Sequence, residues 1–249
     1  MSDVFKAYQL EPLPAIDFSK EFNVLDKLFE GVSLLGDYSQ KTKDEILAQG
    51  ELLSVKLVSS LLNAKSIKAL AVDSRELIKT DGNFGNAKPI ANLSKDNVKN
   101  FYKNSPDEEV KIVTGFIASN AQNETTTLGR NGSNYTAALI SNYLDAEELQ
   151  NYTHVNGIYT ANPELVEDAQ KIRELSFSEA NELANFGTTV LHAKTIIPLV
   201  EKNINLRILN TFNSEDEGTL ITAKPNSKEV TSLSVLDNVA LLNLEGRGL

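Results

Sequence analysis

Residues 125–136 combine turn-forming, cationic and helix-starting residues in the spacing that an anion-binding turn requires. Gly129 and Gly132 flank the turn that holds Arg130, and apolar residues then recur at helical spacing over 135–144. The free N–H groups at the start of a helix, together with a guanidinium group, attract a carboxylate or a phosphate. This segment therefore predicts an anion cradle, although Gly and Asn are also common in turns that bind nothing.

The cradle lies between two regular elements of the sequence. Residues 110–117 are mostly apolar and β-branched, which predicts a buried strand, and residues 133–144 predict a helix with one apolar face. A strand, a turn and a helix in this order place the cradle where a strand ends and a helix begins.

The rest of the chain continues this alternation of strands and helices. Helices are expected over residues 18–35, 42–62, 178–185 and 195–203, and strands over 67–72 and 204–209, with a loop-to-strand junction at 156–160. Strands separated by helices need crossover connections, which favour a mostly parallel sheet with helices on both faces. The sequence therefore predicts an α/β fold arranged as a three-layer sandwich.

Composition excludes several classes of function. The 249 residues carry a formal net charge of -10, which disfavours nucleic acids and anionic membranes as partners. The chain has no cysteine and only His154 and His192, so we predict no metal site. The sequence shows neither an apolar signal segment at its start nor an apolar run long enough to cross a bilayer, so a cytoplasmic location is expected.

Four segments, in order and with matching spacing, resemble a known family. They are residues 127–133, 152–163, 186–192 and 210–221. Together they resemble aspartokinases, and most of all the kinase part of bifunctional aspartokinase-homoserine dehydrogenases. The resemblance implies the amino-acid kinase (carbamate kinase-like) fold and a homodimer.

The ends of the chain depart from that family. The family's first strand and its Lys-Phe-Gly-Gly phosphate loop have no counterpart, so we expect the fold to be truncated at the N-terminal strand. Residues 1–223 are predicted to form the kinase-like domain, and residues 224–249 a linker with incomplete strands of an ACT region.

The family phosphorylates the side-chain carboxylate of L-aspartate with Mg-ATP. By resemblance, Glu51 would hold the amino group of the substrate, Arg130 would bind one of its carboxylates, and Gly132 and Ser133 would complete the substrate site. An alternative for Glu51 is a solvated residue on a helix. L-aspartate or a similar small amino acid is thus the expected ligand.

The positions that resemble the nucleotide site form a degenerate set, in which several have lost a charged residue. They are Thr153, His154, Tyr159, Glu164 and Thr189. His154 stands where the family has Asp, Glu164 where it has Arg, and Thr189 where it has a Lys that contacts phosphate. Phosphoryl transfer depends on positioning and on positive charge around the transferred group. These changes therefore remove the groups that would contribute most to the rate of transfer.

Two functions follow from this resemblance. The first is a degenerate aspartokinase, a pseudokinase that keeps part of the aspartate pocket, for which we assign no catalytic residue and no cofactor. The alternative is an active aspartate kinase of lysine, threonine and methionine biosynthesis, which would use Mg-ATP and would need positive charge from elsewhere, such as Lys6 or Lys194.

Overall fold

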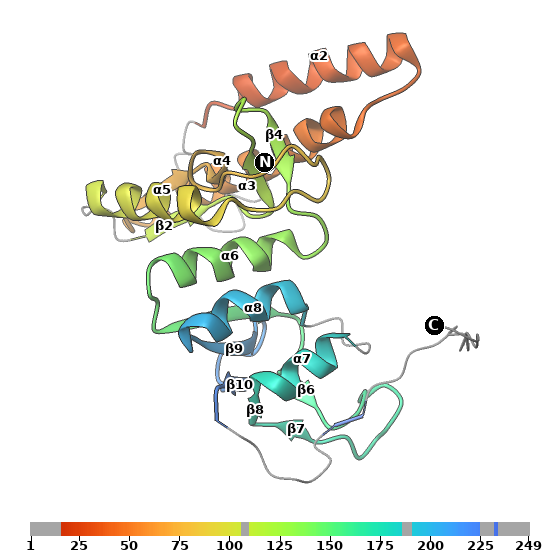
Figure 1. Cartoon of the computed structure of the whole chain (residues 1–249), viewed down its shortest axis with the longest axis vertical. Helices are drawn as coiled ribbons and strands as arrows, with labels where there is room; N and C mark the ends of the chain where they lie inside the picture. Colours follow the sequence, from red (N-terminus) through yellow and green to blue (C-terminus); the bar gives the residue numbers. More distant parts are fainter. Residues whose placement is uncertain (1–15, 106–109, 186–190, 225–231, 234–249) are drawn as a thin grey trace, which may run out of the picture. The chain divides into compact units, whose positions relative to one another are not determined.

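Figure 1 shows the computed structural model of the chain, which describes residues 16–105, 110–185, 191–224 and 232–233. The chain divides into two compact units, Met1–Ala146 and Glu147–Leu249. Each unit contains both helices and strands, so the predicted α/β class is confirmed.

Unit 1 is built around helix α3. Its elements are α2 (Ser19–Leu35), α3 (Gln40–Ala64), β1 (Ala69–Val72), α4 (Ser74–Leu77), α5 (Ala91–Asn104), β2 (Val110–Val113), β3 (Ile117–Ser119), β4 (Thr125–Thr127) and α6 (Gly132–Tyr143). Helix α3 begins at a cap, because Ser39 Oγ accepts a hydrogen bond from Thr42 N at 3.1 Å. Helix α2 ends at Gly36, which is in the left-handed conformation with φ 67°. Helices α5 and α6 pack against each other (Figure 1).

Two short sheets and an apolar cluster hold unit 1 together. Strands β1 and β2 are parallel, with Ala69 opposite Val110, and β3 and β4 form an antiparallel pair with Ile117 opposite Thr127. The core cluster comprises Val72, Leu77, Ile78, Val98, Ala118, Leu128, Leu139 and Tyr143. This cluster draws on β1, α4, α5, β3 and α6, so burial of apolar surface fixes the positions of these five elements.

The predicted single strand over 110–117 is wrong. The chain leaves β2 after Val113, and β3 begins only at Ile117. Between them, Phe116 has φ 49°, a left-handed conformation that a continuous strand does not contain. The sequence analysis missed this break because residues 110–117 are mostly apolar and β-branched, which is typical of one continuous strand.

Unit 2 contains a four-stranded mixed sheet in the order β5-β9-β10-β8. Its elements are β5 (Glu148–Thr153), β6 (Ile158–Tyr159), β7 (Lys171–Ile172), β8 (Glu174–Ser176), α7 (Phe177–Asn185), α8 (Ala193–Lys202), β9 (Asn205–Asn210) and β10 (Thr219–Thr222). Strand β9 is parallel to β5 and antiparallel to β10, and β10 is parallel to β8. Leu206 and Ile208 of β9 are buried at alternate positions, as expected of a central strand.

Some predictions about the chain ends are not tested by this structure. The single domain over residues 1–223 stays a prediction, and nearly all of the segment 224–249 lies outside the described residues. Among the helices that the structure describes, none has both the length and the apolar character needed to cross a lipid bilayer.

Candidate functional site

The strand that leads into the cradle, β4, is polar and buried. Thr125 Oγ1 accepts a hydrogen bond from Arg75 Nη1 at 2.9 Å, and the hydroxyl groups of Thr126 and Thr80 lie 2.7 Å apart. Thr127, the last residue of the strand, is anchored to helix α3. Because each threonine is bonded to a different element, a strand of only three residues is held firmly at the entrance of the turn.

The turn after β4 requires its glycine. Gly129 has φ 77°, and a Cβ atom there would lie 2.8 Å from Asn86 Oδ1. Asn131, at φ 56°, is the residue before helix α6, and Gly132 N donates to Gly129 O at 3.1 Å. The predicted sequence of turn and helix is therefore confirmed, with the helix beginning one residue earlier than expected.

An open pocket of about 280 Å³ lies at the start of α6. It is lined by Phe116, Gly129, Asn131, Gly132, Ser133 and Asn134. Within the described residues, the N–H groups of Ser133 and Asn134 have no acceptor, and the side chains of Arg130 and Ser133 have no hydrogen-bond partner. Several donors of a helix N-terminus are thus left for a ligand with negative charge.

Glu51 reaches this region from helix α3. Its Oε1 accepts a hydrogen bond from Gly115 N at 2.6 Å, and a Cβ atom on Gly115 would lie 2.6 Å from Ser133 Oγ. Oε2 of Glu51 has no hydrogen-bond partner in the part of the chain that the structure describes. The structure therefore brings Glu51 close to the start of α6 and leaves one carboxylate oxygen for a cationic group.

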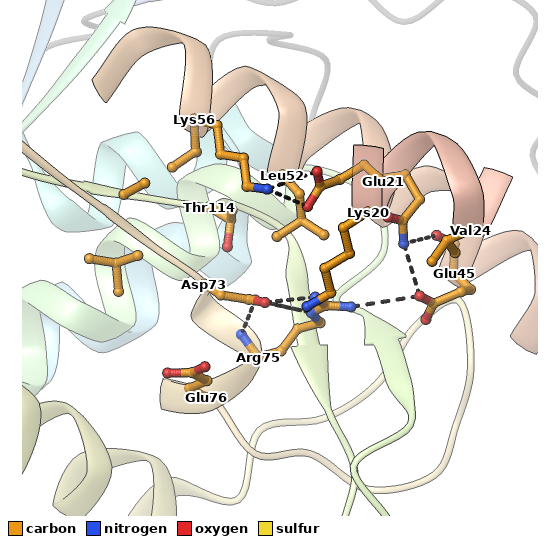
Figure 2. A pocket seen from close by; sticks show the side chains of 14 residues that line it. Lys20, Glu21, Val24, Glu45, Leu52, Lys56, Asp73, Arg75, Glu76 and Thr114 are labelled. Carbon is orange, nitrogen blue, oxygen red and sulfur yellow. Dashed lines mark hydrogen bonds and ion pairs between the residues drawn. The ribbon is translucent and has the colours of Figure 1, made fainter. Parts of the chain in front are cut away.

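A second, larger pocket of about 410 Å³ lies where β1 and β2 end, beside α2 and α3. Figure 2 shows ion pairs among its charged residues: Lys56 Nζ lies 2.7 Å from Glu21 Oε1, and Arg75 Nη2 lies 2.7 Å from Asp73 Oδ2. Burial would lower the pKa of Arg75, but its hydrogen bonds to Asp73 and the charges of Asp73 and Glu45 raise it. Because Lys56 and Arg75 are already paired with carboxylates, they offer a ligand less than the unpaired groups of the cradle do.

In unit 2, polar residues gather where the parallel strands β5 and β9 end. Thr153 is opposite Asn210, and Thr153 Oγ1 lies 3.4 Å from His154 Nδ1. Asn156 Oδ1 accepts a hydrogen bond from Asn210 Nδ2 at 2.7 Å. Ligands of α/β proteins commonly bind at such strand ends, and Thr153 and His154 lie at this edge of the sheet.

The other predicted nucleotide positions are spread over unit 2. Tyr159 lies on β6, and Glu164 lies in an exposed loop where its N–H group donates to Asn162 Oδ1 at 3.0 Å. No hydrogen bond or ion pair between described residues connects the side chain of Glu164 to Thr153 or His154. Thr189 and Lys6 lie outside the described residues.

Residues 6–210 match the model of the amino acid kinase family. The chain belongs to this family. A bifunctional aspartokinase/homoserine dehydrogenase of Buchnera aphidicola is 33% identical over 230 residues, which cover 91% of this chain and 28% of the relative. An aspartokinase of Rickettsia felis is 36% identical over 225 residues, which cover 89% of this chain and 55% of the relative. This amino acid kinase family chain thus spans about half, or less, of the length of these relatives.

The fold of this family member is that of the aspartokinases. A crystal structure of E. coli aspartokinase III in complex with aspartate and ADP matches with a TM-score of 0.74 and 33% identity, over 81% of this chain and 46% of that chain. The aspartate kinase of Clostridium acetobutylicum matches with a TM-score of 0.71 and 26% identity, over 93% of this chain and 51% of that chain. The predicted family and amino-acid kinase fold are both confirmed.

Two features of the site were not predicted from the sequence. One is the left-handed Phe116, which lines the cradle pocket, and the other is Asp44, to which Thr127 is anchored. Asp44 lies in the charged stretch 40–45, so nothing in the sequence distinguishes it from a solvent-exposed aspartate. The only available signal was the run of three threonines before the cradle, because buried hydroxyl groups need partners.

Proposed function

We propose that this chain is an aspartokinase homologue that binds L-aspartate, or a similar small amino acid, at the start of α6 and is impaired in phosphoryl transfer. The observation that carries the proposal is the set of unpaired groups that the cradle turn, the start of α6 and Glu51 provide. Arg130 and the first N–H groups of α6 have no partner among the described residues, and neither has Oε2 of Glu51.

This arrangement suits a zwitterion. A carboxylate of the ligand would accept hydrogen bonds from Arg130 and from the N–H groups of Ser133 and Asn134, which carry the positive end of the helix dipole. The ammonium group of the ligand would donate to Glu51, which Gly115 N orients from the other side. The similarity to a structure of E. coli aspartokinase III with bound aspartate and ADP supports the choice of L-aspartate.

The impaired transfer is inferred from the residues of unit 2. Where the resemblance expects Asp, Arg and Lys, the chain has His154, Glu164 and Thr189. Losing one preorganised contact to a developing charge lowers a rate by about 10²- to 10³-fold. In addition, a carboxylate at Glu164 would repel phosphate groups nearby.

An assay that couples ADP release to L-aspartate tests this proposal on the pure protein. We expect no aspartate-dependent ADP release above that of a control with Glu51→Ala and Arg130→Ala combined. Turnover by the unaltered chain, abolished in this control, would show an active aspartate kinase instead. That second candidate is favoured by one observation, namely that Glu51, Arg130 and Ser133 are all present.

Homodimer formation and a cytoplasmic location are further parts of the proposal and rest on the resemblance to aspartokinases. Analytical ultracentrifugation tests the first. A single species with the mass of two chains is expected, and a monomer at all concentrations up to about 100-fold above that of the activity assay would contradict it.

A further inference from the structure

Asp44 of helix α3 is fully buried, at 0% exposure, and is surrounded by hydrogen-bond donors. Its Oδ2 accepts from Gly85 N at 2.7 Å and from Thr127 N at 3.0 Å. Its Oδ1 accepts from Thr127 Oγ1 at 2.9 Å and from Gln40 Nε2 at 3.5 Å. No Lys or Arg of the described residues forms an ion pair with it, so these donors alone stabilise the buried carboxylate.

These hydrogen bonds join three segments that are distant in sequence. Asp44 is 41 residues from Gly85 and 83 residues from Thr127. The joined segments also contact each other, because Ala87 N donates to Thr127 O at 2.8 Å. Helix α3, the loop before Ala87 and the end of β4 thus meet at one carboxylate.

The cradle turn follows directly from this junction. A Cβ atom on Gly129 would lie 3.2 Å from Gly85 O, so the loop that Asp44 holds forms one wall of the turn. On the other side, Leu128 N donates to Phe116 O at 2.9 Å. The turn is therefore held by Phe116 on one side and by the loop around Gly85 on the other, and Asp44 holds that loop in place.

Without Asp44, the junction would lose its only described acceptor for two main-chain donors. The N–H groups of Gly85 and Thr127 would be left without a partner next to a buried strand, which is unfavourable. Strand β4 has only three residues and could not hold its end in place by β pairing alone.

We propose that Asp44 is a positioning residue, which holds the turn Gly129–Asn131 in the conformation that presents Arg130 and the start of α6 to a ligand. The identity of that ligand rests on the function proposed above. The positioning itself does not, because it concerns the conformation of the free protein.

Amide hydrogen exchange of the full chain without ligand tests the positioning directly. Asp44→Ala is expected to raise exchange by about tenfold or more at Gly85, at Thr127 and over residues 128–134, with little change in helix α5. Asp44→Asn is expected to stay near the unaltered chain, because its carbonyl oxygen can still accept from both N–H groups while its NH₂ group donates to Thr127 Oγ1.

Val98→Ala is the matched control, because Val98 is fully buried in the same core cluster as Leu128 but takes no part in the hydrogen bonds of Asp44, so it loosens the core without touching the junction. It should raise exchange in α5 and not selectively over 128–134. Asp44→Ala with unchanged exchange over 128–134, or with the same pattern as Val98→Ala, would overturn the proposal. If Asp44→Ala does not fold, Thr127→Val removes one bond of the junction and should raise exchange over 128–134 by a smaller factor; no rise there would equally overturn it.

Calorimetric titration with L-aspartate distinguishes failure of the positioning role of Asp44 from failure of the proposed function. If the unaltered chain binds, Asp44→Ala should weaken binding by about tenfold or more while Asp44→Asn restores it. Equal affinity of Asp44→Ala and the unaltered chain would contradict positioning. If the unaltered chain does not bind L-aspartate, the proposed function fails, while the exchange result still decides the role of Asp44.

Discussion

Arg130 shows most simply what a single residue contributes to the cradle. Its side chain is exposed and makes no hydrogen bond or ion pair with the described residues, so the folded protein does not need it for stability. A guanidinium group kept without a partner beside a helix N-terminus is suited to bind a carboxylate. Its contribution should therefore be visible in binding and not in folding.

Arg130→Gln is predicted to weaken L-aspartate binding about 10- to 100-fold, because a hydrogen bond to a charged group is worth about 1.5–3 kcal/mol. Its melting temperature should stay unchanged. Isothermal titration and thermal denaturation measure the two effects. Arg173→Gln makes the same change in charge at an exposed site of unit 2 and should alter neither; equal loss of binding in both variants would show a nonspecific charge effect.

Gly132 lies where the first turn of α6 crosses Phe116. A Cβ atom there would lie 2.6 Å from Phe116 Cβ and 3.3 Å from Leu128 Cβ, so even a methyl group forces a shift. Gly132→Ala is predicted to destabilise the protein by about 1–3 kcal/mol, as overpacking typically does. Denaturant unfolding measures this change.

Gly31→Ala is the control for this substitution. Gly31 lies in helix α2, and a Cβ atom added there would have no atom within 4 Å, so alanine should fit and favour the helix by up to about 1 kcal/mol. A neutral Gly132→Ala would mean that the contact between α6 and Phe116 is not close.

Among the elements, helix α3 connects the two features on which the cradle depends. Asp44 and Glu51 are seven residues apart, which is close to two helical turns, so they lie on the same face. Fraying at the N-terminus of α3 would therefore disturb the junction at Asp44 first, five residues from the cap.

Ser39→Ala is predicted to destabilise unit 1 by about 0.5–2 kcal/mol, since it removes the capping bond to Thr42 N. Chemical denaturation gives the value. Ser54→Ala, in the exposed interior of the same helix, is the matched change and should stabilise the helix by up to about 0.5 kcal/mol. Similar losses for both serines would exclude a role for the cap.

In unit 2, strands β5 and β9 are joined by an ion pair. Arg207 Nε donates to both oxygens of Glu148, at 3.1 and 3.2 Å, and these hydrogen bonds hold the pKa of Glu148 below its usual range. A carboxyl group whose pKa is lowered by folding stabilises the protein above its unfolded pKa of about 4.3. That contribution is lost as the pH falls through the lower, folded pKa.

Glu148→Gln is therefore predicted to lower stability by about 0.5–1 kcal/mol at neutral pH. The difference from the unaltered chain should shrink to nothing as the pH falls through the folded pKa of Glu148. Urea unfolding between pH 7 and about pH 3 follows this change. Glu147→Gln, at the exposed neighbouring residue, should show almost no effect, and a difference for Glu148→Gln that persists at low pH would contradict the ion pair.

At the scale of the whole molecule, the α/β class could be predicted because helix periodicity is a local property. Helix α6 was expected over residues 133–144 and spans Gly132–Tyr143. Local turn chemistry likewise predicted the cradle. What could not be predicted depends on contacts between residues that are distant in sequence. The hydrogen bonds of Asp44 join residues that are 41 and 83 positions apart. The break at Phe116 lies in a mostly apolar run that is typical of one continuous strand. Strand β5 was missed because its sequence, ELQNYT, is mostly polar.

The central claim is that the chain keeps an amino-acid cradle without an effective site for phosphoryl transfer. Calorimetric titrations of one protein sample with L-aspartate and with Mg-ATP test it most directly. We predict saturable binding of L-aspartate, weakened by Arg130→Gln, and no saturable binding of Mg-ATP over the same concentration range. Saturable Mg-ATP binding without any binding of L-aspartate would contradict the account.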